Sequence, residues 1–175
     1  MKHGLVVACA LAVSLPGWGQ SLTPGESDLY RLVQAYRDSL GLPRIPLSPS
    51  LVTVAQAHAR DLAQHRPDGG ACNTHSWSAS GPWTACCYTP DHAQAACMWN
   101  KPRELTRYRG NGYEIACASS GAISAAGALQ SWLGSAGHRS VIANEDAWKD
   151  MHWGAIGVGM SGGYAVVWFG VEPDE

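Results

Sequence analysis

Two histidines and one glutamate are the side chains of this sequence whose types and spacing could do chemistry together. Glu114 lies in the segment 112–116, His138 follows Trp132 by six residues, and His75 lies far upstream of both. Two neutral imidazoles and one carboxylate are a sufficient ligand set for a zinc ion that keeps water in its fourth position. The same three groups could also support a proton transfer, or could hold a small fold together through hydrogen bonds.

The composition predicts one packed domain, and the N-terminal segment predicts that this domain is secreted. The chain has 175 residues, of which 46% are hydrophobic and 15% charged, with a formal net charge of −2. No basic run is present, so we expect no nucleic-acid partner. A short basic start, an apolar run over residues 5–15 and a Pro/Gly break predict a signal peptide over residues 1–20. We expect residues 21–175 to form a single secreted domain, periplasmic or extracellular, with no transmembrane segment after removal of the signal.

Cysteine usage supports an oxidising compartment. One of the six cysteines lies in the expected signal peptide, and four of the other five, Cys72, Cys86, Cys87 and Cys97, are close together in the sequence. We predict two disulfides among these four and a free thiol at Cys117. Adjacent cysteines rarely bridge each other, so Cys72 pairs with either Cys86 or Cys87. A zinc cluster of the four thiols is the alternative, although the paired C-x-x-C spacing of zinc ribbons is missing.

The elements that would position these groups indicate an α+β fold. Helical periodicity after the Thr-Pro and Ser-Pro starts at Thr23 and Ser48 predicts two helices, and the apolar run 166–169 is typical of a central strand. A small antiparallel sheet flanked by helices, an α-β-α sandwich with a disulfide-rich loop segment, is the simplest assembly. We expect three helices, which begin after Thr23, begin after Ser48, and span 122–134 with Gly137 as the stop. Between the second and third helices we expect an irregular segment, 66–111, with short helical turns at 92–99 and 102–108, and after the third helix a turn at 138–144. The expected strands are 113–117, 153–160 and 164–169.

Three stretches of the chain resemble the CAP superfamily of cysteine-rich secretory proteins, venom allergens and pathogenesis-related proteins, in particular its bacterial SCP-domain members. They are the helix pair represented by 32–37 and 55–59, the segment 132–139, which is similar to the family pattern W-x-x-S-P-G-H-R, and the strand pair 156–159 and 164–170. The resemblance implies a central cavity that holds two histidines and one or two glutamates and that binds zinc or another divalent cation in many members.

The resemblance assigns residues of this chain to that cavity. His75 and His138 match the two cavity histidines, which makes both of them possible metal ligands, and Glu114 is the candidate acid. When Ile115 is aligned with the family pattern G-E-N-hydrophobic-A, Glu114 falls on the Asn and Tyr113 on the Glu. An offset of one residue turns a strand side chain to the other face, and a local bulge would restore its direction. No acid in 122–134 matches the second family glutamate.

These residues support three functional hypotheses. The first is a secreted, non-enzymatic CAP-domain protein that binds a partner protein or a small apolar ligand, such as a lipid, sterol or peptide, in the histidine-containing cavity. It requires no cofactor, although zinc or another divalent cation could bind weakly. The second is a metal-assisted hydrolase or peptidase in which His75 and His138 hold the ion and Glu114 orients or deprotonates water. The third is a structural cell-envelope protein. We expect His58 to pack within the second helix and His92 to be part of the loop structure.

Overall fold

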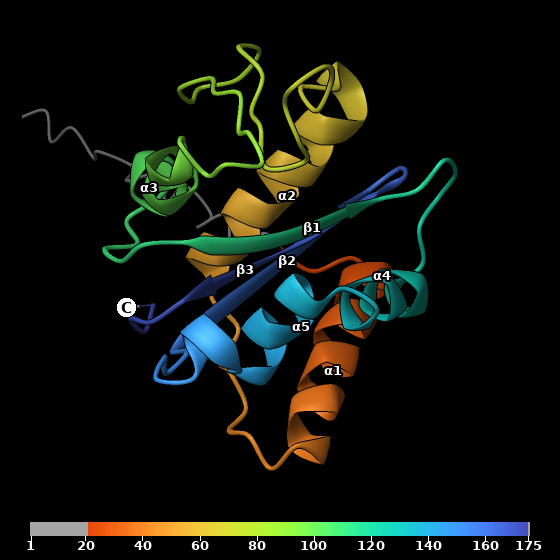
Figure 1. Ribbon diagram of the computed structural model, residues 1–175, viewed down its shortest axis with the longest axis vertical. Helices are drawn as coiled ribbons and strands as arrows, with labels where there is room; N and C mark the ends of the chain where they lie inside the picture. Colours follow the sequence, from red (N-terminus) through yellow and green to blue (C-terminus); the bar gives the residue numbers. More distant parts are fainter. Residues whose placement is uncertain (1–20, 175) are drawn as a thin grey trace, which may run out of the picture.

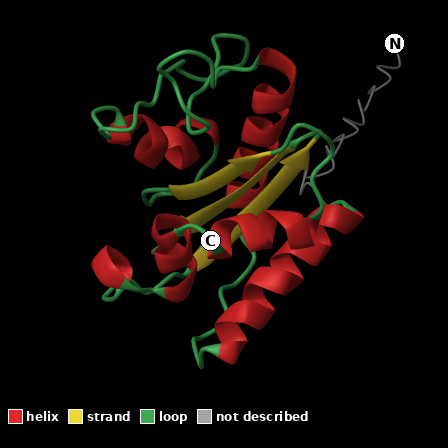
Figure 2. Cartoon of the chain, turned by 45° about the vertical axis from the view of Figure 1, so that its right-hand side comes forward, coloured by secondary structure: helices red, strands yellow, loops and turns green. Residues whose placement is uncertain are grey.

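The computed structural model describes residues 21–174 as three layers, with a small sheet between two groups of helices (Figures 1 and 2). The predicted signal peptide lies outside the described residues. Of the helices in the described range, none combines the length and the apolar character that a membrane crossing needs. The elements are α1 (Pro24–Ser39), α2 (Pro49–His65), α3 (Ala95–Leu105), β1 (Tyr113–Ala118), α4 (Ala125–Leu133), α5 (Ala136–Ala143), the short 3-10 helix η1 (Asp146–Trp148), β2 (Ala155–Ser161) and β3 (Tyr164–Gly170).

The first two helices begin where the sequence predicts. Thr23 caps α1 in a capping box with Glu26, and proline occupies the first helical position. Ser48 caps α2 by accepting a hydrogen bond from the backbone N–H of Leu51. Each cap satisfies backbone donors that the first turn of a helix leaves free. These two signals therefore fix where the long helices start.

The sheet has the strand order β1-β3-β2, and all of its pairs are antiparallel. Every residue of β3 is buried, which confirms the prediction that the apolar run 166–169 belongs to a central strand. Helices α1, α4 and α5 cover one face of the sheet, and α2 covers the other (Figure 1). The strand β1 is an edge strand, because its only paired neighbour in the sheet is β3. The predicted α+β sandwich is thus confirmed.

Two predictions of local structure were wrong. The turns expected at 92–99 and 102–108 form one helix, α3, with Pro102 inside it. Contacts of the buried Lys101 and the disulfide at Cys97 hold this helix together, although the ring nitrogen of Pro102 carries no hydrogen to donate. Gly137 does not end the preceding helix: α4 already ends before Gly134, and Gly137 lies in the first turn of α5. Tertiary contacts override these local signals.

The segment between α2 and β1 is held by two disulfides, as predicted. Cys72 is bonded to Cys87, and Cys86 is bonded to Cys97 in the first turn of α3. This selects one of the two pairings that the sequence left open and excludes the zinc cluster of the same four thiols. Cys117 is the free cysteine among residues 21–174, and it is buried in β1. The bridges fix the loop that carries His75 against the rest of the domain.

Candidate functional site

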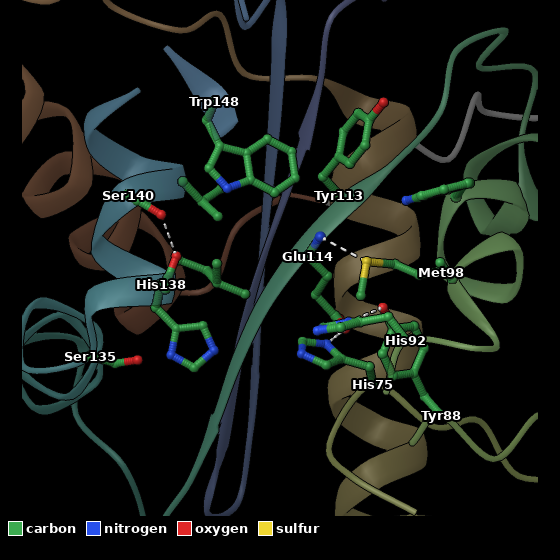
Figure 3. A pocket seen from close by; sticks show the side chains of 15 residues that line it. His75, Tyr88, His92, Met98, Tyr113, Glu114, Ser135, His138, Ser140 and Trp148 are labelled. Carbon is green, nitrogen blue, oxygen red and sulfur yellow. Dashed lines mark hydrogen bonds and ion pairs between the residues drawn. The ribbon is translucent and has the colours of Figure 1, made fainter. Parts of the chain in front are cut away.

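His75, Glu114 and His138 line one pocket of about 440 Å³. The three side chains come from the loop after α2, from β1 and from α5, so no single element builds the site. Figure 3 shows Glu114 and His75 on one side of β1 and His138 on the other. The walls are mainly aromatic and aliphatic and include Trp99 and Trp148.

Glu114 points into this site without any distortion of β1. Its side chain is completely buried, and its Oε2 lies 2.8 Å from Nδ1 of His75. The pairing of β1 with β3 runs one to one from Tyr113 to Ala118, so no bulge is needed to turn Glu114. Tyr113 points to the opposite face, where its ring lies 5.3 Å from that of Trp148. The carboxylate therefore reaches His75 directly from the position that the family alignment gives to Asn.

His58 is a fourth member of this group. It lies on α2 and is completely buried, and its ring stacks on that of Trp77 with the centroids 4.1 Å apart. Its Nδ1 lies 2.5 Å from Oε1 of Glu114, and its Nε2 lies 2.9 Å from the backbone oxygen of Ser76. The prediction that His58 packs within the helix omitted these two hydrogen bonds. A histidine on the apolar face of a helix needs polar partners, and that requirement was the available signal.

The hydrogen-bond partners fix the protons of this cluster. The backbone carbonyl of Ser76 can only accept, so Nε2 of His58 must donate to it. One proton then lies between Nδ1 of His58 and Oε1 of Glu114, and Nδ1 of His75 donates to the other carboxylate oxygen. Nε2 of His75 has no hydrogen-bond partner among residues 21–174.

Burial and neighbouring side chains shift the pKa values of two cavity groups, Glu114 and His138. Burial alone would raise the pKa of Glu114, but the charge and hydrogen bond of His58, together with those of His75, outweigh it and hold that pKa below its ordinary value. Burial lowers the pKa of His138, and the nearby His75 lowers it further, whereas Glu114 acts in the opposite direction. His138 is therefore held in the neutral form near neutral pH.

The described side chains show no assembled set of three ligands for a metal ion. Both carboxylate oxygens of Glu114 already accept hydrogen bonds from imidazoles, and His138 makes no hydrogen bond to Glu114 or His75. Over residues 21–174, no three His, Cys, Asp or Glu side chains are grouped so that they could hold an ion. We therefore derive no chemical step through a metal.

The hydroxyl groups near the histidines do not form a nucleophile–base pair. The hydroxyl of Ser140 donates to the backbone oxygen of Gly137, and that of Ser76 contacts the backbone of Tyr88. Covalent catalysis requires a hydroxyl or thiol within hydrogen-bond reach of a base. In the described part of the chain, neither His75 nor His138 has such a partner.

His92 also lines the pocket, at its outer end. It is exposed, with a left-handed backbone at φ 59°, and its Nδ1 lies 3.0 Å from the hydroxyl of Tyr88. The loop position was predicted, but the contact with Tyr88, the residue after the bridged Cys87, was not. The pocket is thus lined by three histidines, His75, His92 and His138, and by one carboxylate, Glu114, whose two oxygens both accept hydrogen bonds.

This geometry defines a class of protein: an α-β-α domain with a disulfide-bonded loop and a histidine-containing pocket at the edge of its sheet. A family model described as the cysteine-rich secretory protein family, CAP, matches residues 30–150. The chain belongs to the CAP family, as the sequence resemblance predicted. Comparison with curated protein sequences gives no match.

Solved structures with this fold come from several bacteria. An extracellular protein with an SCP domain from Bacillus anthracis is 20% identical, with a TM-score of 0.56 over 87% of this chain and 45% of that one. An outer surface protein of Borrelia burgdorferi is 18% identical, with a TM-score of 0.55 over 85% of this chain and 95% of that one. A cysteine-rich secretory protein of Staphylococcus aureus is 14% identical, with a TM-score of 0.53 over 85% of this chain and 38% of that one. The chain spans less than half of the Bacillus and Staphylococcus proteins, and these identities establish the fold alone.

Proposed function

We propose that this chain is a secreted CAP-domain protein that binds an apolar ligand, or an apolar segment of a partner protein, without catalysing a reaction on it. The observation that carries this proposal is the pocket itself. Both carboxylate oxygens of Glu114 on its polar floor are engaged by His58 and His75, and its walls are mainly apolar and aromatic. A pocket of about 440 Å³ is within the size range of small-molecule sites.

Export is the second part of the proposal. The apolar run in residues 1–20 would direct secretion, and the two disulfides require an oxidising compartment. Similar folds occur in proteins described as extracellular or outer-surface. Fractionation of cells that express the full chain, followed by N-terminal sequencing, tests this part. Retention of residues 1–20 on a cytoplasmic protein would contradict it.

Ligand binding is tested with defined probes. Palmitate, cholesterol and a mixture of linear apolar peptides are titrated against the purified protein while its melting temperature and tryptophan fluorescence are measured. A ligand present at one hundred times its Kd should raise the melting temperature by about 5–10 °C for a domain of this size. If none of these probes raises it, the proposed function is wrong.

A matched pair of variants locates the binding site. Trp99 and Leu40 are both exposed apolar residues, at 40% and 46% of their accessible surface, but only Trp99 lines the pocket. Trp99→Ala should weaken binding of any active probe, because it removes apolar contact area from the wall. Leu40→Ala should leave the binding unchanged. Equal effects of the two substitutions would place the ligand outside this pocket.

A further inference from the structure

The pocket lies along the free edge of β1, not over one face of the sheet. Three consecutive residues, Tyr113, Glu114 and Ile115, all line it. Successive side chains of a strand point to opposite faces, and here Ile115 packs in the core beneath α1 and α4 while Glu114 contacts the α2 side. Only a pocket at the strand edge can touch all three residues. Figure 3 shows this edge between the His138 side and the His75 side.

The backbone groups on this edge are not paired with another strand. In an antiparallel ladder alternate residues direct their N–H and C=O groups away from the partner strand. Just before β1, the outward N–H of Gly112 is bonded to the backbone oxygen of Trp99 at 3.0 Å, and within β1 the outward N–H of Glu114 lies 3.3 Å from Sδ of Met98. A thioether sulfur is a weak acceptor. No hydrogen bond reaches the carbonyl of Glu114 from residues 21–174.

Glu114 therefore presents two adjacent backbone groups to the pocket, a donor that is bonded only to sulfur and an acceptor without a donor. An extended peptide carries the complementary acceptor and donor on one residue, at the spacing of a strand pair. An ionised fatty acid can only accept hydrogen bonds, and a sterol offers one hydroxyl in place of a separate donor and acceptor at this spacing. The pattern of these two groups thus favours a peptide backbone over a lipid.

We propose that the pocket binds an extended, apolar peptide segment that adds to the edge of β1, with one peptide residue exchanging two backbone hydrogen bonds with Glu114. The peptide carbonyl displaces Sδ of Met98, whose unbranched side chain can rotate away. Strand addition to an exposed sheet edge is a general mode of peptide recognition, in which main-chain hydrogen bonds give affinity and side-chain pockets give specificity.

The length of the pairing is limited on both sides of Glu114. Toward Gly112 the edge is already occupied by the carbonyl of Trp99, and on the other side Ala116 is buried and does not line the pocket. One residue of β1 is therefore available, and the side chains that flank it on the peptide must supply the remaining affinity. In an antiparallel pair the side chain of the paired peptide residue lies on the Glu114 face of the sheet, and the side chains of its two neighbours both lie on the Tyr113 face, where Trp148 lines the pocket. This wall selects large apolar side chains at the two neighbouring positions.

This inference rests on the proposed function, because it assumes that the pocket is a ligand site. To test it, the full chain with both disulfides formed is screened against a displayed library of random linear nonapeptides. The tightest binder is then synthesised with each backbone amide N-methylated in turn. We expect N-methylation at one position to lower the affinity about tenfold or more, because it removes the donor to the Glu114 carbonyl and blocks the strand pairing. The Glu114 amide signal should shift in ¹H–¹⁵N spectra when the parent peptide binds.

The Met98→Leu variant supplies a second measurement, which changes the protein side of the proposed pairing instead of the peptide. The substitution nearly conserves side-chain volume but removes the sulfur that competes for the Glu114 N–H. Peptide affinity should rise by about two- to tenfold, since the free protein loses a hydrogen bond that the complex does not use. An unchanged or weaker peptide affinity in Met98→Leu would overturn the displacement of Sδ.

The other outcomes separate this inference from the proposed function. If palmitate or cholesterol binds in the pocket and no library peptide does, the peptide inference fails and the proposed function stands. If a peptide binds but no N-methylated position matters and the Glu114 amide signal does not move, pairing at β1 is wrong while the pocket remains a ligand site. If no probe of any class binds, both proposals fail.

Discussion

The hydrogen bonds of Glu114 make a sharp prediction about two substitutions at this position. Glu114→Ala removes the acceptor of His58 and of His75 and leaves Nδ1 of the completely buried His58 without a partner. Removing one partner of a buried charged pair costs about 3–5 kcal/mol. Because 1 kcal/mol shifts the melting temperature of a domain of this size by about 2–4 °C, Glu114→Ala should lower it by about 6–20 °C.

Glu114→Gln should behave differently, because the amide can satisfy both imidazoles. The amide NH₂ donates to Nδ1 of a neutral His58, and the amide oxygen accepts Nδ1–H of His75, so the bond from His58 to the Ser76 carbonyl is also kept. We expect Glu114→Gln to lower the free energy of unfolding by about 1 kcal/mol or less. Urea denaturation at pH 7, followed by tryptophan fluorescence and circular dichroism with the disulfides intact, measures both variants.

A matched control and two results decide the outcome. The control is Glu145→Ala, which removes a half-exposed ion pair with Arg139 at 3.5 Å. It should lower the free energy of unfolding by less than about 1 kcal/mol. If Glu114→Gln is as unstable as Glu114→Ala, the charge of the carboxylate matters and satisfaction by neutral tautomers is the wrong account. If Glu114→Ala costs no more than the control, the cluster does not stabilise the fold.

Three further predictions concern acid, thiol reactivity and the disulfides. The pKa of Glu114 is lowered in the folded state, so the stabilisation from its ionised form is present above the unfolded value of about 4.3 and is lost as the pH falls through the folded pKa. The urea midpoints of wild type and Glu114→Gln should therefore converge as the pH falls below about 4.3; a difference that does not change with pH contradicts this. Burial raises the pKa of Cys117 to about 11, so native protein at pH 8 should resist iodoacetamide and unfolded protein should react, as mass spectrometry would show; rapid labelling of the native protein would refute it. Replacing Cys86 and Cys97 together by Ser should cost about 2–3 kcal/mol for this 11-residue separation, and an unchanged urea midpoint would show that the bridge does not stabilise the fold.

The sequence predicted the parts of the fold that have local causes. Caps at Thr23 and Ser48 mark helix starts, and an uninterrupted apolar run marks the central strand β3. The helix α3 was not predicted, because the cost of Pro102 inside it is offset by contacts from distant residues. The disulfide pairing could not be deduced either, since both arrangements satisfy the same spacing rules.

The candidate site was predicted in part. His75, Glu114 and His138 do share a pocket, but the closest partner of Glu114 is His58, from a helix that lies 56 residues earlier in the chain. That contact depends on how α2 crosses the sheet, which no local pattern encodes. The direction of Glu114 likewise depends on the register between β1 and β3, which is set by pairing and not by the order of residues.

The balance of charge in the cluster bears on which ligand the pocket favours. One carboxylate is shared by two imidazoles, and α4, which resemblance to the family would expect to supply a second acid, contains none. A divalent cation would have to break the bonds from both His58 and His75 to gain this single carboxylate, and would leave a buried imidazole unpaired. A neutral ligand leaves these bonds intact and meets instead the backbone groups at the β1 edge. The same hydrogen bonds that orient Glu114 toward the histidines thus oppose coordination of its carboxylate by a cation.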